Sequence, residues 1–180
     1  MAEIIPAQKQ SMRKPYPTQE RLREILQYDP ETGSFYWAVD CNRLVRKGDK
    51  AGFVVKKGGD RSYVLIQING VVYRAHNIAW IYVYGGIPDH LHIDHIDRIG
   101  TNNKISNLRL ATRAQNDANK KAKPNSNGYR GVHKNNKKWM SQISINGVCE
   151  YLGTFDSPSE AHEAYKKRAI EAFGEFAFTE

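Results

Sequence analysis

The sequence contains little cysteine and no long apolar run. Its two cysteines, Cys41 and Cys149, lie far apart among 180 residues. This spacing excludes a disulfide framework and a Cys-x-x-Cys zinc site, so a reduced, cytoplasmic protein is the default expectation. The longest apolar run, Ile78 to Tyr84, has seven residues, whereas a membrane span needs ~20. The first residues also lack the basic start and apolar stretch of a secretory signal. We therefore expect no membrane as a partner.

Positive charge is in excess and unevenly placed. The chain has 27 Lys and Arg residues against 19 Asp and Glu residues, a formal net charge of +8. Residues 91–127 hold seven basic and three acidic side chains, and residues 128–148 hold four basic side chains and no acidic one. The remaining acids of the last third follow residue 148, which predicts a basic sheet backed by an acidic helix. Clustered positive charge attracts nucleic acid, although an ordinary solvated basic surface fits the charge alone equally well.

Turn and cap signals divide the chain into two parts. The proline-bearing residues 1–17 read as a flexible arm, and the polar residues 123–127 read as a linker. Between them, residues 18–122 show a helix beginning at Thr18, a strand at 35–37, a hairpin around Asn69-Gly70 and an apolar helix at 77–84. Residues 128–180 predict three strands and one amphipathic helix that starts with a capping box at Ser157. The expected fold class is α+β.

One short segment concentrates polar chemistry. Residues 90–97 contain three histidines and two aspartates. The surrounding pattern predicts a strand at 91–96, a second strand at 108–111 and a helix starting at Thr112, which has Gln115 in capping-box position. Strand alternation would point Asp94 and His95 to opposite faces. The two side chains can therefore serve one site only if the strand bends or ends there.

These residue types suit metal-assisted hydrolysis. A hard divalent cation takes oxygen ligands, which the Asp94 carboxylate and the Asn116 amide can supply. An imidazole that is free of metal can remove a proton from water near neutral pH, and His95 is the candidate. The Asn107 amide oxygen could orient its ring. His92 lies on the same strand face as Asp94, and whether it joins the metal site stays open.

The pattern resembles the HNH endonucleases, in particular the free-standing enzymes of phages and mobile elements. The similarity rests on Asp94-His95, on Asn102-Asn103, on Ser106-Asn-Leu-Arg109 and on Asn116, and it extends to the stretches 73–80 and 28–33. The sequence departs from the family pattern at two positions. Arg98 follows Asp97 where the family has glycine, and Asn77 replaces the usual arginine after the upstream histidine.

The resemblance implies a ββα-metal motif at about 90–121 within a nuclease domain of residues 18–122. It implies that Asp94 and Asn116 hold one divalent ion, Mg²⁺ with Mn²⁺ as a substitute, that His95 is the general base, and that Asn107 orients His95. The basic residues that would bind double-stranded DNA here are Arg98, Lys104, Arg109 and Arg113.

The activity that follows is phosphodiester hydrolysis leaving 5′-phosphate and 3′-hydroxyl ends, by a phage- or mobile-element-encoded enzyme of the homing type acting in the bacterial host cytoplasm. A non-catalytic DNA-binding regulator derived from a nuclease is the alternative, and an RNA-processing nuclease has no support beyond charge. The target sequence, the choice between nicking and double-strand cutting, and the choice between monomer and homodimer stay open.

The last 50 residues or so resemble the plant ethylene-response-factor (Apetala-type) DNA-binding domain. The similar stretches are 128–132, 151–155, 160–165 and 173–177. The resemblance implies a three-stranded antiparallel sheet packed on one helix, with the sheet against DNA. It leaves open whether the sheet reads bases or contacts the backbone alone. The DNA-binding side chains it implies are Arg130, Lys134, Lys137, Lys138 and Trp139.

Overall fold

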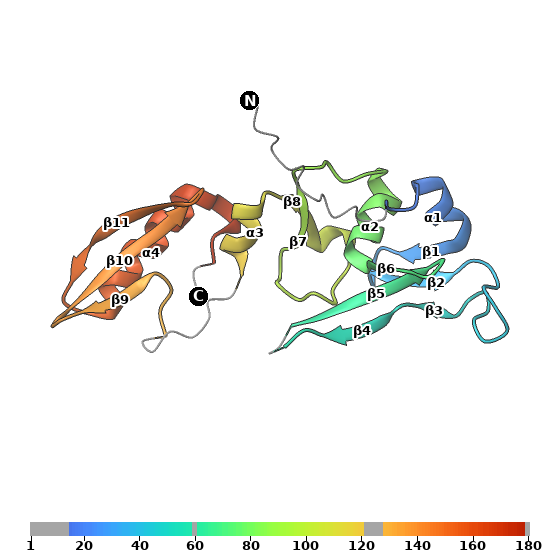
Figure 1. Cartoon of the computed structure of the whole chain (residues 1–180), viewed down its shortest axis with the longest axis horizontal. Helices are drawn as coiled ribbons and strands as arrows, with labels where there is room; N and C mark the ends of the chain where they lie inside the picture. Colours follow the sequence, from blue (N-terminus) through green and yellow to red (C-terminus); the bar gives the residue numbers. More distant parts are fainter. Residues whose placement is uncertain (1–14, 59–60, 121–127, 179–180) are drawn as a thin grey trace, which may run out of the picture.

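The computed structural model describes residues 15–58, 61–120 and 128–178. Most of the predicted arm (1–17) and the whole predicted linker (123–127) lie outside these residues. The architecture is α+β, as predicted, with four small antiparallel sheets and helices packed on them (Figure 1). No helix within the described ranges is long and apolar enough to cross a membrane.

The first half combines two three-stranded sheets with two helices. Thr18 accepts a hydrogen bond from Arg21 N–H and begins α1. The Asn69-Gly70 turn joins β5 and β6 with both residues at positive φ, as this hairpin signal predicts. The sheet orders are β1-β2-β3 and β4-β5-β6. The elements are α1 (Gln19–Ile25), β1 (Leu26–Asp29), β2 (Ser34–Trp37), β3 (Lys50–Ala51), β4 (Phe53–Lys56), β5 (Ser62–Ile68), β6 (Val71–Arg74) and α2 (Ala75–Tyr84).

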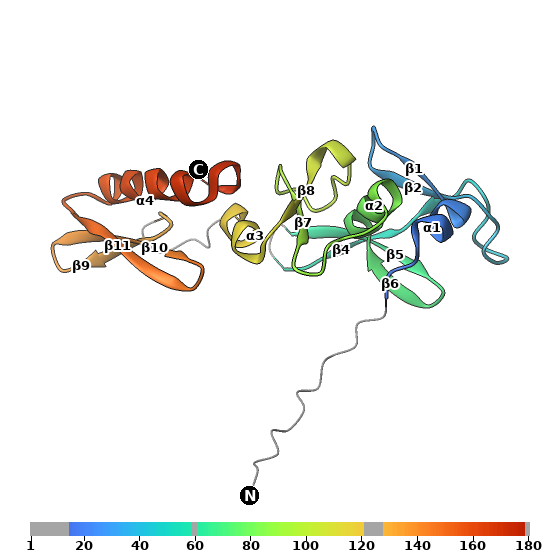
Figure 2. The ribbon, with the colours of Figure 1, turned by 90° about the horizontal axis from the view of Figure 1, so that it is seen from above.

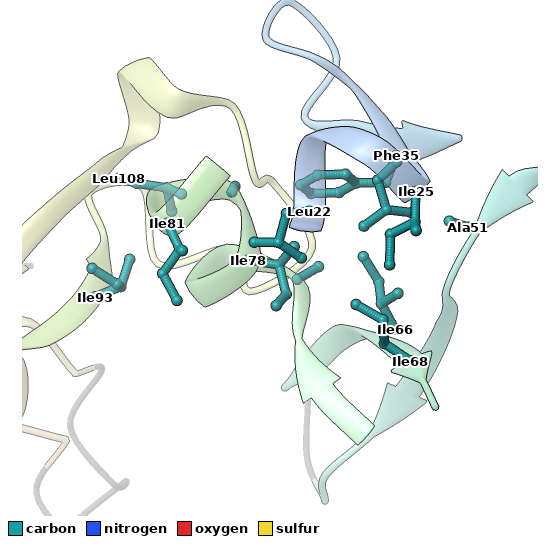
Figure 3. Close-up of a cluster of buried hydrophobic side chains, with 13 residues drawn as sticks. Leu22, Ile25, Phe35, Ala51, Ile66, Ile68, Ile78, Ile81, Ile93 and Leu108 are labelled. Atoms are coloured by element: carbon teal, nitrogen blue, oxygen red, sulfur yellow. The ribbon is translucent and has the colours of Figure 1, made fainter. Parts of the chain in front are cut away.

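The core of this half lies between α1, α2 and the sheets. Leu22 and Ile78 are fully buried where the two helices meet, and Phe35 and Ile66 reach the same cluster from β2 and β5 (Figure 3). Burying such side chains contributes about 1.5–3 kcal/mol each. Ile93 and Leu108 extend the cluster into the next hairpin. The strands that carry the polar site are therefore anchored on one face by the core.

A short hairpin and helix follow, and then the C-terminal module. Figures 1 and 2 both place α3 between the first half and that module. In the module, β9, β10 and β11 form an antiparallel sheet covered by α4. Ser157 and Glu160 make the predicted capping box of α4. The elements are β7 (His92–His95), η1 (Ile105–Asn107), β8 (Leu108–Ala111), α3 (Arg113–Asn119), β9 (Val132–Asn135), β10 (Lys138–Ile145), β11 (Val148–Phe155), α4 (Pro158–Phe173) and η2 (Gly174–Phe176).

Gly131 shows how closely α4 approaches the sheet. Its φ is +71°, and a Cβ there would overlap the Tyr165 ring and lie 2.6 Å from the Gln142 carbonyl oxygen. Gly128 has a similar φ of +74° with nothing within 4 Å of the position of a Cβ. The two glycines therefore share the same backbone requirement and differ in crowding.

We predict that Gly131→Ala destabilises the protein more than Gly128→Ala does. Left-handed backbone alone costs about 1–2 kcal/mol for a non-glycine residue, and overpacking adds about 1–3 kcal/mol. Urea unfolding of the two variants measures the difference. Equal losses of unfolding free energy would show that the Tyr165 ring moves away at no cost.

Candidate active site

The polar residues of segment 90–97 lie on a two-stranded hairpin followed by a helix. Strands β7 and β8 pair antiparallel, with Asp94 opposite Arg109 and His95 opposite Leu108. The Thr112 hydroxyl accepts from Gln115 N–H, and the Gln115 side chain accepts from Thr112 N–H, which begins α3. The order strand, strand, helix is the predicted one. β7 ends at His95, which meets the condition under which neighbouring residues can serve one site.

Asp94 is a buried carboxylate with its partners in place. It is 6% exposed. Asn119 Nδ2 donates to both carboxylate oxygens, at 3.1 and 2.9 Å, and also to the His95 carbonyl oxygen at 2.9 Å. Arg109 Nε donates to Oδ2 at 3.1 Å. A buried charge is tolerated only with such pairing, so Asp94 ties β7, β8 and α3 together.

His95 is also buried, at 7% exposure. Its Nε2 lies 3.1 Å from Asn103 Oδ1. Because an amide oxygen only accepts hydrogen bonds, this contact places the ring proton on Nε2 and leaves the lone pair on Nδ1. Burial lowers the pKa of His95, and this outweighs the hydrogen bond to Asn103 and the charges of Asp97 and Asp94, which raise it. The ring is therefore neutral near pH 7 and able to accept a proton.

The structure assigns the orienting amide differently from the sequence. Asn107 does not contact His95, because its Oδ1 accepts from Asp97 N–H and its Nδ2 donates to the Asp97 carboxylate and the Asn102 carbonyl. The expected partner is thus replaced by Asn103, which is 1% exposed. Asn107 instead shapes the loop after β7. Several asparagines follow His95, and spacing alone does not tell which of them reaches the ring.

Asn103 is held in place by a turn about 70 residues upstream in the chain. Tyr28 Oη donates to the Asn103 carbonyl oxygen at 2.7 Å. Burial is the main cause that raises the pKa of Tyr28 to about 12, so the phenol keeps its proton. Gly33, with φ +69°, packs directly against the backbone of Asn103 and Lys104, where a Cβ would overlap both. The stretch 28–33 therefore braces the His95 partner.

His76 of α2 packs behind His95. Their rings meet edge to face with centroids 4.8 Å apart. His76 is 3% exposed and its Nδ1 is buried without a hydrogen-bond partner. Burial lowers its pKa well below the usual value, with smaller contributions from His95 and Arg74. A neutral His76 adds no positive charge beside His95.

Asn119, rather than Asn116, touches Asp94. Both residues lie on α3, with Asn116 one turn earlier and half-buried. The Asn116 amide makes no hydrogen bond within the described part of the chain. Its assignment as a metal ligand stays a prediction. Asn119 had no signal of its own in the sequence, because it lies at the last residue of a short helix.

The oxygen atoms at Asp94 are ligands of the kind that a hard cation binds. A carboxylate offers about four lone-pair positions, and the Asn119 and Arg109 contacts use three of them. One position on Oδ1 is left, and the Asn116 amide lies on α3, the helix that also carries Asn119. Among the described residues no group of three His, Cys, Asp or Glu side chains gathers. The described residues here thus offer a carboxylate and amide oxygens, which are ligands of the kind that a hard divalent cation takes.

The predicted DNA-binding cations of the hairpin differ in exposure. Lys104 and Arg113 are exposed. Arg98 is exposed and its guanidinium lies over the Phe178 ring, 4.5 Å from the centroid. The Arg109 side chain is only 11% exposed, because it contacts Asp94, Glu175 and the Phe176 ring. In this structure the Arg109 side chain is therefore engaged by other residues of the protein.

The C-terminal module also departs from a uniformly basic sheet face. Arg130 donates to the carbonyl oxygens of Asp117, Ala118 and Lys120, at 2.8–3.0 Å. It therefore satisfies the free carbonyls at the end of α3, and it is not available as a DNA contact in this structure.

The remaining predicted residues of this module divide between the two faces of the sheet. Trp139 alternates with the buried Ser141 and Ile143, and it pairs with Lys134. Both therefore lie on the face that α4 covers. Lys138 lies on the open face, and Lys137 lies in the turn before it.

A groove of about 780 Å³ runs between α3 and the sheet. Arg113, His133 and Gln142 are among its lining residues. The open sheet face thus continues into a groove that leads to the helix of the candidate site.

Comparisons with known proteins agree with this geometry. Residues 73–118 match the family described as HNH endonuclease. An uncharacterized HNH endonuclease, L560, of Acanthamoeba polyphaga mimivirus is 35% identical over 127 residues, which cover 69% of this chain and 64% of the relative. Protein 3.8 of Escherichia phage T7 is 32% identical over 107 residues, 58% of this chain and 88% of that protein. The chain thus spans less than two thirds of the mimivirus protein.

A solved structure, described as "DNA binding and cleavage by the HNH homing endonuclease I-HmuI", is also similar. It is 19% identical, with a TM-score of 0.40, and the match covers 82% of this chain and 84% of that one. A likeness at this level carries no conclusion about the present chain.

We predict that Gly33→Ala disturbs His95 from a distance. The added methyl group displaces the Asn103 backbone, so the His95 ring loses its fixed proton on Nε2. Imidazole ¹⁵N chemical shifts should change from one tautomer to a mixture. Gly48→Ala is the matched control, since Gly48 has φ +90° with nothing within 4 Å. A Gly33→Ala spectrum identical to that of the control would refute the brace.

Proposed function

We propose that this chain, which carries an HNH endonuclease domain, is a metal-dependent endonuclease that hydrolyses phosphodiester bonds of double-stranded DNA. The observation that carries the proposal is the pair of buried contacts His95–Asn103 and Asp94–Asn119. Both pairs lie on the ββα unit, which the family match largely covers. A positioned neutral imidazole beside a buried carboxylate is suited to activating water next to a bound cation.

The side chains divide the work. Asn103 fixes the His95 ring with its proton on Nε2, so Nδ1 takes the proton of the attacking water. His95 Nδ1 has no hydrogen-bond partner in the described part of the chain, so it is the ring nitrogen that remains to accept this proton. His76 packs behind the ring and, being neutral, adds no charge there. The products we expect carry 5′-phosphate and 3′-hydroxyl ends.

Asp94 and one asparagine amide oxygen would hold the metal ion. The geometry brings Asn119 to Asp94, through its Nδ2 donor, and the sequence favours Asn116. Mg²⁺ is the expected ion, with Mn²⁺ as a substitute. When bound, such an ion stabilises negative charge on the phosphate and on the leaving oxygen.

The C-terminal module would anchor the enzyme on DNA. Lys137, Lys138 and the exposed Arg113 remain as phosphate contacts, and of these Arg113 lines the groove between α3 and the sheet. Phosphate contacts supply affinity and position without sequence information. Backbone anchoring is therefore better supported than base reading for this sheet.

Both relatives come from viruses, a mimivirus and a bacteriophage. We accordingly propose a phage- or mobile-element-encoded nuclease that meets its DNA in the cytoplasm of a host cell. One such site cuts one strand at a time, so a double-strand break would need two events or two copies.

We predict that the purified protein nicks or linearises plasmid DNA with Mg²⁺ or Mn²⁺, and that chelation stops it. His95→Ala should lower the rate by about 10²–10⁴-fold, the usual contribution of a general base. His90→Ala, an exposed histidine in the preceding turn, is the matched control and should cut normally. DNA binding without cutting under any of these conditions would favour the non-catalytic regulator instead.

We predict that Asn119→Ala weakens Mn²⁺ binding to the DNA-free protein by at least about 10-fold, the size expected for loss of a group that holds a ligand. Asn116→Ala, one turn away on the same helix, should bind Mn²⁺ nearly as the parent does. Electron paramagnetic resonance titration measures free Mn²⁺ directly. The reverse ranking would assign the ligand to Asn116.

A further inference from the structure

The last described turn of the chain packs onto the arginines of the candidate nuclease site. The Arg109 guanidinium carbon lies 3.7 Å from the Phe176 ring centroid, and Arg109 Nη1 donates to the Glu175 carbonyl oxygen at 3.2 Å. The Glu175 carboxylate lies 3.4 Å from the same nitrogen. Figures 1 and 2 show this end of the chain beside α3.

A second, exposed arginine contacts the same segment. Arg98 follows the β7 end and lies over the Phe178 ring. Two aromatic rings of one short segment thus contact two arginines of the ββα unit, one in the loop after β7 and one on β8. Both rings belong to residues that are buried, at 8% and 6% exposure, so the segment is seated and not merely adjacent.

Arg109 also has an unused hydrogen-bond donor. Its Nη2 is buried without a hydrogen-bond partner among the residues that the structure describes, although an unpaired buried donor costs about 1–3 kcal/mol. Its Nε is bound to Asp94. The guanidinium therefore stands next to the proposed metal carboxylate with a donor that a phosphate oxygen would satisfy.

The Glu175 carboxylate, which contacts the neighbouring Nη1, is the easily exchanged part of this contact. The Glu175 side chain is 73% exposed, and exposed ion pairs contribute only about 0–1 kcal/mol. A DNA phosphate brings the same charge as the Glu175 carboxylate and more acceptor oxygens. It also brings neighbouring phosphates for Lys104 and Arg113.

We infer that Arg98 and Arg109 form a phosphate-binding subsite for the DNA backbone, and that residues 174–178 cover it in the free protein as an intramolecular latch. The Glu175 carboxylate takes the place of a phosphate at Arg109. DNA binding displaces the turn, which frees the arginines and releases the C-terminal module from α3 on that side. The inference rests on the proposed function, because it requires DNA as the ligand.

The test measures DNA affinity without cutting. A short fluorescein-labelled duplex is titrated with the full-length protein at low salt in EDTA, and anisotropy reports binding. Glu175→Gln, which removes the charge and keeps the shape, should tighten binding about two- to five-fold, the equivalent of one exposed ion pair. Phe176→Leu should tighten it as well. The gain from Glu175→Gln should shrink at high salt.

Two controls make the result specific. Glu163→Gln removes the same charge from an exposed position on α4, where it pairs with Lys166, and should give a smaller gain. Arg109→Ala combined with Glu175→Gln should show no gain over Arg109→Ala alone. Thermal unfolding checks that each variant is folded.

The outcomes separate the two proposals. If the parent binds DNA and Glu175→Gln binds no tighter than Glu163→Gln, the latch is overturned while the endonuclease proposal stands. If Glu175→Gln and Phe176→Leu weaken binding, the turn is a brace and the latch is overturned as well. If no variant binds DNA at all, the proposed function itself fails.

Discussion

The buried carboxylate of Asp94 is the interaction on which the rest of the site depends. A charge with 6% exposure must be matched by donors, since an unpaired buried ion is strongly destabilising. Arg109 matches it from the neighbouring strand and Asn119 from the end of α3. The demand for pairing therefore fixes how helix and hairpin pack. The same demand leaves one lone pair for a cation.

The proposed general base, His95, is supported by residues from the first half of the chain. His95 depends on Asn103, and Asn103 depends on the turn that contains Tyr28 and Gly33. This turn belongs to the first sheet, far from the hairpin in sequence. The upstream half thus acts as a scaffold that holds the loop after β7, and a loop alone would not position a buried imidazole.

The basic side chains of this molecule have two roles, attraction of polyanions and contacts inside the protein. The excess of +8 draws the protein toward polyanions as a whole. Several of the individual cations are nonetheless engaged internally. Arg130 donates to carbonyl oxygens at the C-terminal end of α3. Arg109 pairs with Asp94 and Glu175. Composition therefore indicates the partner, while the structure decides which side chains are available to meet it.

The sequence by itself determined the caps and turns, and it predicted the strand–strand–helix motif with its two central residues. Caps at Thr18, Thr112 and Ser157 and the Asn-Gly turns specify structure through contacts a few residues apart, so a linear pattern reveals them. Asp94 and His95 could be predicted as site residues because an acid and an imidazole are chemically distinct. Their amide partners were not, since every asparagine nearby offers the same group. Only the tertiary structure decided between Asn107 and Asn103, brought Asn119 to Asp94, and covered Arg109 with Phe176. These choices depend on which helix end or turn arrives in space, a matter of packing between segments that spacing along the chain does not encode.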